Sequence, residues 1–149
     1  MKILAENKKA YFNYQILEKF TAGIVLQGQE VKSLKTRGVN LAGNYVVIKN
    51  NEVFWVGAKI PPYQPKNTPA DYQPERSRKL LLQKKEIKRL IGKSKEKGLT
   101  LIPLRLYTKN TKIKLEFALA KGKKKFEKKE LIKKREVEKE IAKELKMRG

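Results

Sequence analysis

The first apolar residues of the chain fall into short runs separated by small residues. Aromatic and branched side chains recur over positions 11–20, and a second apolar run over 23–28 begins and ends in glycine. Runs of this length bounded by glycine are typical of β-strands. The pattern therefore predicts two strands joined by a tight turn over residues 21–23.

A different spacing follows. Val31 and Leu34 are three positions apart with charged residues between them, and Gly38 closes the segment. This spacing, with a glycine at its end, predicts a short helix. Glu30 falls in its first turn, where a carboxylate interacts favourably with the positive end of the helix dipole.

The middle of the chain contains a hairpin signal and then a loop signal. The β-rich runs at 45–49 and 53–60 flank an Asn-Asn-Glu sequence at 50–52, which predicts a β-hairpin. Residues 61–74 contain five of the six prolines in the chain. Because proline cannot donate to a backbone ladder, this stretch is expected to be a long irregular loop.

The last apolar patterns are a helix and two strands. Leu80, Ile87, Leu90 and Ile91 predict an amphipathic helix over 80–97 with a basic outer face. Strands are predicted over 99–107 and 113–120, the second from strict alternation of apolar and other residues. Pro103 indicates an edge or a bulge in the first of these strands.

The resulting order, β-β-α-β-β-α-β-β, has no regular strand–helix–strand repeat, which argues against a parallel sheet. It predicts a mainly β (α+β) fold, a small six-stranded antiparallel barrel, closed or partly closed, of the oligonucleotide-binding (OB-like) kind with flanking helices. Residues 1–120 would form this barrel. Residues 121–149, here called the tail, contain no proline and few apolar residues and would form a basic appendage.

Charge and composition narrow the function. The chain has 37 Lys and Arg against 15 Asp and Glu, a net charge of +22, and neither Cys nor His. Such an excess indicates a polyanionic partner. Without histidine, cysteine or paired carboxylates, neither an enzyme nor a metal or cofactor site is expected. No long apolar run indicates a membrane span or a signal peptide, so a cytoplasmic protein is expected.

Basic residues beside aromatic rings give candidate RNA contacts. Lys8 and Lys9 precede Tyr11, Phe12 and Tyr14, and amines suit phosphates while rings stack on unpaired bases. The alternative for Tyr14 is a core position, and the sequence leaves both open. The cations of 76–85 form either a binding edge or a solvated face.

These segments, in this order, resemble the SsrA-binding protein family, SmpB. The segments that carry the resemblance are AENKKA (5–10), FTAGIVLQGQEVKSLKTRGVNL (20–41), YVVIKNNEVFWVGAKIPPY (45–63), RSRKLLLQKKEI (76–87), IGKSKEKGLTLIPLRLY (91–107) and ALAKGKKKFEKK (118–129). The resemblance implies an OB-like barrel that binds transfer-messenger RNA (tmRNA) at its tRNA-like domain and brings it to stalled ribosomes. It further implies a monomer without catalysis, whose tail is disordered when free and helical in the empty mRNA channel, against small-subunit rRNA.

The family's positions carry over residue by residue. The RNA-binding positions fall on Asn7, Lys8, Lys9, Glu30, Lys32, Lys35, Arg78 and Lys79, to which Tyr14 is added from the aromatic pattern. The ribosome-binding positions of the tail fall on Gly122, Lys123, Lys124, Lys128, Lys129, Lys133, Lys134 and Arg135. The chain departs from the family pattern at Thr21, at residues 11–13 and at residues 127–129.

Two other classes remain open from the residues alone. One is a generic single-stranded-RNA chaperone or ribosome-associated protein, and the other is a basic structural protein that coats nucleic acid. Both predict little discrimination among RNAs. In the tail, Val137, Ile141 and Leu145 form a narrow apolar stripe, and an isolated helix of this kind is marginal in water. The tail is therefore either a solubilising extension or a segment that orders on its partner.

Overall fold

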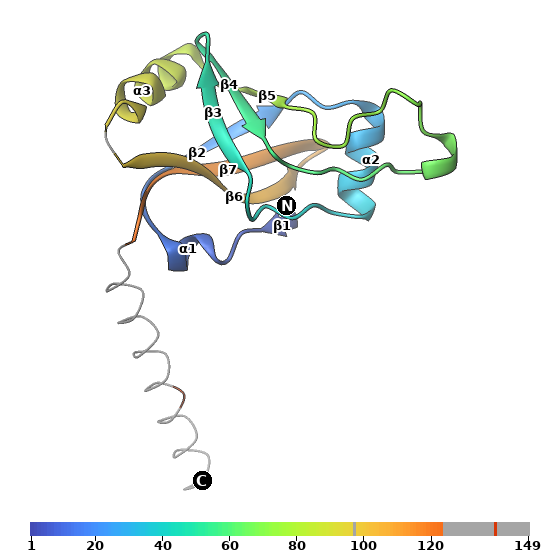
Figure 1. Ribbon diagram of the computed structural model, residues 1–149, viewed down its shortest axis with the longest axis horizontal. Helices are drawn as coiled ribbons and strands as arrows, with labels where there is room; N and C mark the ends of the chain where they lie inside the picture. The colour runs from blue at the N-terminus through green and yellow to red at the C-terminus, as the bar shows by residue number, and fades with distance from the viewer. Residues whose placement is uncertain (97, 124–138, 140–149) are drawn as a thin grey trace, which may run out of the picture.

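A computed structural model gives the fold of the chain and describes residues 1–96, 98–123 and 139 (Figure 1). In chain order the elements are β1 (Lys2–Glu6), α1 (Ala10–Asn13), β2 (Tyr14–Ile24), α2 (Gly28–Thr36), β3 (Tyr45–Lys49), β4 (Glu52–Val56), η1 (Pro65–Asn67), β5 (Arg78–Leu81), α3 (Lys84–Ser94), β6 (Leu99–Lys109) and β7 (Lys112–Gly122). The described part of the chain is thus mainly strand, and every strand pairing in it is antiparallel.

Six of the strands follow one another around a ring in the order β6-β3-β4-β5-β2-β7, and β7 pairs back with β6. β1 lies outside the ring, against the half of β6 that β3 leaves free. The closure is uneven, because β3 meets β6 only at Val46 and Leu101, whereas β6 and β7 pair along their whole length. The predicted OB-like antiparallel barrel with flanking helices is confirmed, in a partly closed form.

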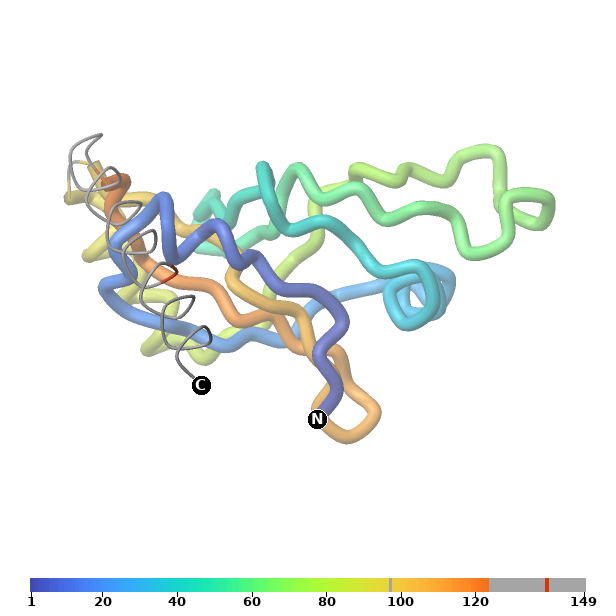
Figure 2. The backbone as a smooth tube through the Cα atoms, turned by 90° about the horizontal axis from the view of Figure 1, so that it is seen from below, coloured from blue at the N-terminus to red at the C-terminus, as the bar shows by residue number. Residues whose placement is uncertain are grey.

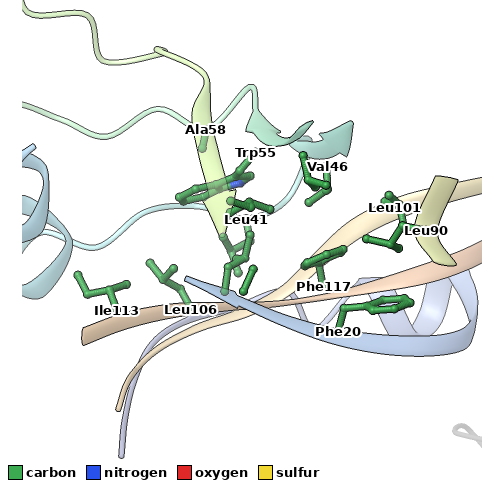
Figure 3. Close-up of a cluster of buried hydrophobic side chains, with 14 of the residues drawn as sticks. Phe20, Leu41, Val46, Trp55, Ala58, Leu90, Leu101, Leu106, Ile113 and Phe117 are labelled. Carbon is green, nitrogen blue, oxygen red and sulfur yellow. The ribbon is translucent and has the colours of Figure 1, made fainter. Parts of the chain in front are cut away.

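The long hairpin of β6 and β7 has buried side chains on both of its faces. On one face Leu115, Phe117 and Leu119 point into the ring, where Phe117 stacks on Phe20 with ring centroids 5.6 Å apart (Figure 3). On the other face Ala118 and Ala120 pack under α1 in a second, smaller cluster. The strand predicted over 113–120 is confirmed, but exposure alternates only as far as residue 117, because Ala118 and Ala120 are buried in the second cluster. The bulge expected near Pro103 is also found, where the register of β6 shifts between Pro103 and Arg105.

The hairpin predicted around residues 50–52 is confirmed as β3 and β4. Asn50 and Asn51 have φ of 53° and 61°, the left-handed conformation that asparagine tolerates and that a tight hairpin turn requires. The short helix predicted near Val31 is confirmed as α2. Gln27 and Glu30 form its capping box, in which each side chain bonds a free backbone N–H at the start of the helix.

The turn predicted over 21–23 is wrong, because residues 14–24 form the single strand β2. Gly23 is a strand residue that pairs with Leu81 of β5. A Cβ placed on Gly23 would lie 3.5 Å from Cβ of Leu81, an ordinary van der Waals distance. The glycine therefore lies inside a strand here and does not mark a turn.

The helix predicted from residue 80 is also wrong at its start. Residues 78–81 form β5, and α3 begins only at Lys84. Strand pairing of Leu80 with Val53 and Ile24 overrides the local helical pattern. The strand β1 and the one-turn helix α1 were not predicted, since neither carries a periodic signal long enough to detect.

Two further segments, at opposite ends of the barrel, lie next to the candidate site residues. The chain between β4 and β5, residues 57–77, extends away from the barrel beside α2 and is called the excursion below (Figures 1 and 2). At the other end, β7 continues to Gly122, two residues past the predicted boundary, and the N–H of Lys123 donates to the carbonyl of Asn13. The predicted helix of the tail lies outside the described residues.

Candidate nucleic-acid interface

A fully buried carboxylate ties α2 to the excursion. Glu30 is 0 % exposed, and its Oε1 accepts from the N–H of Gln27 at 2.8 Å and from Arg76. Its Oε2 accepts from Nε of Arg78 at 2.8 Å. Burial alone would raise the pKa of the Glu30 carboxyl, but the Gln27 N–H and the two guanidinium groups together hold that pKa below its ordinary value. Glu30, Arg76 and Arg78 are called the buried cluster below.

Arg78 extends the cluster into the excursion. The side chain of Arg78 is itself 0 % exposed, and its remaining donors reach the carbonyls of Ala58 at 2.7 Å and Pro74 at 2.8 Å. One guanidinium therefore holds both ends of the excursion and the helix at the same time. The hydroxyl of Tyr72 adds a bond to the carbonyl of Ile60 at 2.9 Å. Burial and the nearby charge of Glu30 raise the pKa of that hydroxyl, so it remains a proton donor.

Further contacts hold α2 against the excursion. The Ser33 hydroxyl donates to the carbonyl of Pro61, and the Thr68 hydroxyl donates to Oε1 of Gln29 at 3.0 Å. Nζ of Lys32 lies 5.8 Å from the centre of the Tyr63 ring. Lys32 and Lys35 are exposed, so two cations stand on a helix whose position the buried cluster fixes.

Glu30 and Arg78 thus occupy positions that the sequence did not suggest. Both were predicted to contact RNA, and in this structure neither side chain has any exposed surface. Their neighbours in sequence do face solvent: Lys32 lies on the outer side of α2, and Lys79 alternates with Arg78 along β5. Lys79 lies 3.6 Å from Glu52, and both side chains are about half exposed. The direct RNA contacts predicted for Lys32, Lys35 and Lys79 stay predictions.

The amino-terminal candidates lie on the opposite side of the β6–β7 hairpin. Asn7 is tied to β6, because its backbone N–H donates to the carbonyl of Leu104 at 2.7 Å and its side-chain amide to that of Pro103 at 3.0 Å. Lys8 and Lys9 follow it and are exposed. The Tyr14 ring is half-buried against the small cluster under α1, so it serves the core at least in part.

Beside Asn7 the structure shows a pocket of about 490 Å³ that the sequence did not predict. Three cations, a ring and two carboxylates are among the groups that line it: Lys8, Lys19, Arg105, Tyr11, Glu6 and Glu116. Nζ of Lys19 lies 5.5 Å from the centre of the Tyr11 ring, and Arg105 pairs with Glu116 at 3.3 Å. Lys19 and Arg105 come from strands far apart in sequence. Only the register that places Thr21 and Arg105 on either side of Glu116 brings them together.

The described part of the tail begins beside this pocket. Gly122 ends β7, and Nζ of Lys123 donates to the carbonyl of Tyr11 at 3.0 Å. The other predicted tail residues (Lys124, Lys128, Lys129, Lys133, Lys134 and Arg135) lie outside the described residues. Among the helices that the structure describes, none is both long and apolar enough to cross a membrane.

Comparison with known proteins finds a family model and relatives that match this chain. The SmpB protein family model matches residues 4–147. The chain is 51% identical to the SsrA-binding protein of Persephonella marina, over 98% of this chain and 95% of that one. It is 52% identical to the SsrA-binding protein of Thermosipho africanus, over 98% of each.

A solved structure described as "tmRNA-SmpB: a journey to the center of the bacterial ribosome" has a chain that matches with a TM-score of 0.67 and 43% identity. The match covers 81% of this chain and 85% of that one. The sequence matches cover nearly the whole chain, and the structural match covers about four fifths of it. The chain belongs to the SmpB protein family.

Proposed function

We propose that this chain is a tmRNA-binding factor of trans-translation. It binds the tRNA-like domain of tmRNA, brings it to stalled ribosomes and allows the nascent chain to be tagged and the ribosome released. The observation that carries this proposal is the family match over residues 4–147, together with relatives described as SsrA-binding proteins. A related chain in a solved structure of tmRNA, SmpB and the bacterial ribosome supports the same partners.

In this proposal the exposed lysines contact tmRNA and the buried cluster positions them. Lys32 and Lys35 on α2, Lys79 on β5, and Lys8 and Lys9 before α1 are all exposed, and phosphates pair with exposed ammonium groups. Glu30 and Arg78 act as positioning residues, because they fix α2 and the excursion without reaching solvent. Asn7 keeps a free amide oxygen next to the 490 Å³ pocket, where an unpaired nucleotide would fit.

The tail has a separate role in this proposal: it orders as a helix along the empty mRNA channel. Its 29 residues would span about 44 Å at about 1.5 Å per residue. Basic residues on several sides suit a channel lined by phosphates, and their contacts would offset the cost of ordering the segment. The candidate contacts are Gly122, Lys123, Lys124, Lys128, Lys129, Lys133, Lys134 and Arg135.

The factor would act as a cytoplasmic monomer without catalysis, replacing a missing codon–anticodon contact by shape and charge. A chain with neither histidine nor cysteine lacks the commonest general base and nucleophile. The alternative is a generic single-stranded-RNA chaperone. It is less favoured because the relatives are named for binding one particular RNA.

Competition between tmRNA and bulk tRNA at fixed salt tests the proposal. We expect tmRNA to bind tighter, and affinity to fall about a thousandfold or more between 50 and 200 mM salt if six to ten phosphates are neutralised. Replacing Lys32 and Lys35 together by Ala reduces that salt slope by about 2. Equal binding of tmRNA and unrelated stem-loops at 200 mM salt would favour the generic chaperone.

Truncation after Lys123 tests the separation of barrel and tail. The last described contacts of β7 are those of Lys123 with residues 11 and 13, so this truncation leaves the sheet intact. We expect an unchanged melting temperature, unchanged tmRNA affinity and loss of peptide tagging on stalled ribosomes. A fall in tmRNA affinity would show that the tail belongs to the tmRNA-binding surface.

A further inference from the structure

The pocket beside Asn7 opens where one face of the sheet changes from apolar to charged. Ala118 and Ala120 of β7 are buried there with Ala10 of α1, which lies on the side of the β6–β7 hairpin away from β3 and β4 (Figure 1). Side chains on one face of a strand recur every second residue, so Glu116 is the next on this face. It lines the pocket instead of joining the small cluster. The floor of the pocket therefore contains a carboxylate.

Glu116 is only partly satisfied by the protein. Its cross-strand partners are Thr21 of β2 on one side and Arg105 of β6 on the other. Oε2 accepts from Arg105 at 3.3 Å, longer than the about 2.7–2.9 Å of a strong charge-assisted bond. Within residues 1–96 and 98–123, Oε1 accepts no hydrogen bond, whereas both oxygens of Glu30 do. The carboxylate of Glu116 thus keeps one oxygen for a ligand.

Arg105 is held in place but is also incompletely paired. Its guanidinium carbon lies 5.1 Å from the centre of the Tyr107 ring, and its Nη2 donates to Glu116. Its Nε is buried without a hydrogen-bond partner. The ring and the ion pair fix the guanidinium against the wall of the pocket. Arg105 therefore acts as a positioning residue that orients the carboxylate of Glu116.

An exposed ring and two ammonium groups complete the pocket. Tyr11 is 48 % exposed, and Lys123 holds its backbone carbonyl at 3.0 Å. Nζ of Lys19 lies 5.5 Å from the centre of the Tyr11 ring, and Lys8 is exposed beside it. An exposed ring stacks well on an unpaired base, and ammonium groups pair with the phosphates on either side of that base. The pocket thus combines a stacking platform with an acceptor at its floor.

A carboxylate in such a pocket selects among the four bases. It is an acceptor only, so it must meet donors on the base. Guanine presents two adjacent donors, N1–H and the N2 amino group, and one carboxylate can bind both. Adenine and cytosine place a ring-nitrogen acceptor next to their amino group, which a carboxylate oxygen repels, and uracil has one N–H between two carbonyl oxygens. Guanine also carries O6 and N7, the acceptors that Lys and Arg bind.

We propose that this pocket binds an unpaired guanosine of RNA, which stacks on Tyr11 while Glu116 reads its N1–H and N2 amino group. Lys8 and Lys19 hold the flanking phosphates, and Arg105 orients the carboxylate. The proposal rests on the function proposed above and deepens it. Phosphate contacts supply affinity without sequence information, and this pocket supplies discrimination by base. Free guanine nucleotides share the same base chemistry, so the test includes GMP.

Short oligouridine RNAs with one central guanosine, inosine or adenosine test the pocket by fluorescence anisotropy at a fixed low salt concentration. Inosine is guanosine without the N2 amino group. The proteins are the wild type, Glu116→Gln and the control Glu18→Gln. Glu18 is also a partly exposed carboxylate paired with cations, but it faces α3. Both substitutions remove one negative charge, so net charge predicts the same small gain in affinity for every probe. Base reading predicts a change in the ratio between probes.

We expect the wild type to bind the guanosine probe about tenfold or more tightly than the adenosine probe, with the inosine probe in between. In Glu116→Gln the ratio should fall to within about twofold, because the glutamine amide can donate to adenine as well as accept from guanine. Glu18→Gln should keep the wild-type ratio. An unchanged ratio in Glu116→Gln, or an equal fall in both variants, overturns the proposal. Equal binding of inosine and guanosine by the wild type also overturns it, whatever the stability of the variants.

Tyr11→Leu separates stacking from base reading. It should bind the guanosine and adenosine probes alike about fivefold or more weakly and leave their ratio unchanged, because every base has a face to stack. Undiminished affinity would overturn the role given to the ring. GMP should displace the guanosine probe better than AMP does, but less well than the unlabelled guanosine RNA. GMP as effective as that RNA would make the pocket a free-nucleotide site and overturn its assignment to RNA.

The two proposals fail separately. If the wild type preferred the guanosine probe but not tmRNA over bulk tRNA, the proposed function would fail and the guanosine pocket would stand. If it preferred tmRNA but bound all three probes equally, the guanosine pocket alone would fail.

Discussion

Two clusters in this protein have the same charges, one carboxylate and two cations, and opposite environments. In the buried cluster, Glu30 of α2 is held by Arg76 and Arg78. In the second, here called the surface cluster, Glu18 of β2 is held by Arg89 and Lys93 of α3. Each joins a helix to the barrel through one carboxylate and two cations. They differ in exposure: the side chains of Glu30 and Arg78 are both 0 % exposed, whereas Arg89 is 59 % exposed.

The difference shows that the number of ion pairs is a poor guide to what they contribute to the free energy of unfolding. Water and salt screen the surface cluster, and exposed pairs contribute about 0–1 kcal/mol each. In the buried cluster, hydrogen bonds to Gln27, Ala58 and Pro74 replace part of the water that Glu30 and Arg78 lose. Removing one member there leaves a buried charge without its counter-charge. The comparison yields four predictions.

The largest effect is expected from matched neutral variants of the two glutamates. Glu30→Gln should lower the free energy of unfolding by about 3–5 kcal/mol, because it leaves Arg78 buried without a counter-charge. Glu18→Gln, with the same chemistry in the surface cluster, should cost about 1 kcal/mol or less. Urea denaturation of both variants measures the two values. Similar losses would mean that the environments do not differ in the way the exposures indicate.

The arginines give the next largest contrast. In Arg78→Lys the charge remains, but one ammonium cannot span Glu30 and the carbonyls of Ala58 and Pro74, which a planar guanidinium reaches together. We expect a loss of about 2 kcal/mol, accompanied by faster proteolysis within the excursion. Arg89→Lys should change stability by less than about 0.5 kcal/mol. A much smaller loss of stability in the Arg78→Lys variant would show that charge alone holds the excursion.

The contrast also shows where inference from sequence stops. The exposure of the candidate lysines was predictable, since Lys32, Lys35 and Lys79 face solvent, as lysine side chains usually do. The burial of Glu30 was not, because a glutamate in a first helical turn has the same local pattern whether buried or exposed. Its partners lie 46 and 48 positions further along the chain. Lys19 and Arg105 were missed for the same reason.

The local sequence pattern predicted the fold correctly wherever one clear periodicity or turn signal was present. The alternation over 113–120 and the asparagine turn at 50–51 were enough to predict β7 and the β3–β4 hairpin. Residues 80–82, three leucines in a row, fit a strand or a buried helix equally well, and pairing with Val53 and Ile24 decided the outcome. Leu81 is 52 % exposed, so this run is not uniformly core.

Acid should weaken the buried cluster. The pKa of Glu30 in the folded protein lies below its ordinary value of 4.5. The folded state therefore binds the proton less readily than the unfolded chain. The stability that the ionised carboxylate contributes is fully present above about pH 4.5 and is lost as the pH falls through the folded-state pKa. The stability gap between wild type and Glu30→Gln should narrow over this range, as measured by thermal denaturation from pH 7 to pH 2.5. A constant gap would mean that protonation of Glu30 is not linked to folding.

Salt gives the smallest and last contrast. The Debye length falls from about 10 Å at 0.1 M salt to about 3 Å at 1 M, which is enough to screen exposed pairs but not buried ones. The cost of Glu18→Gln should therefore fall from at most about 1 kcal/mol at 0.1 M to near zero at 1 M. The cost of Glu30→Gln should stay nearly constant, because no ions enter its site. Urea titrations of the wild type and both variants at the two salt concentrations measure this, with each variant compared with the wild type at the same salt. If the costs of Glu30→Gln and Glu18→Gln fell in parallel, salt and water would be reaching Glu30. The distinction between the buried cluster and the surface cluster would then not hold.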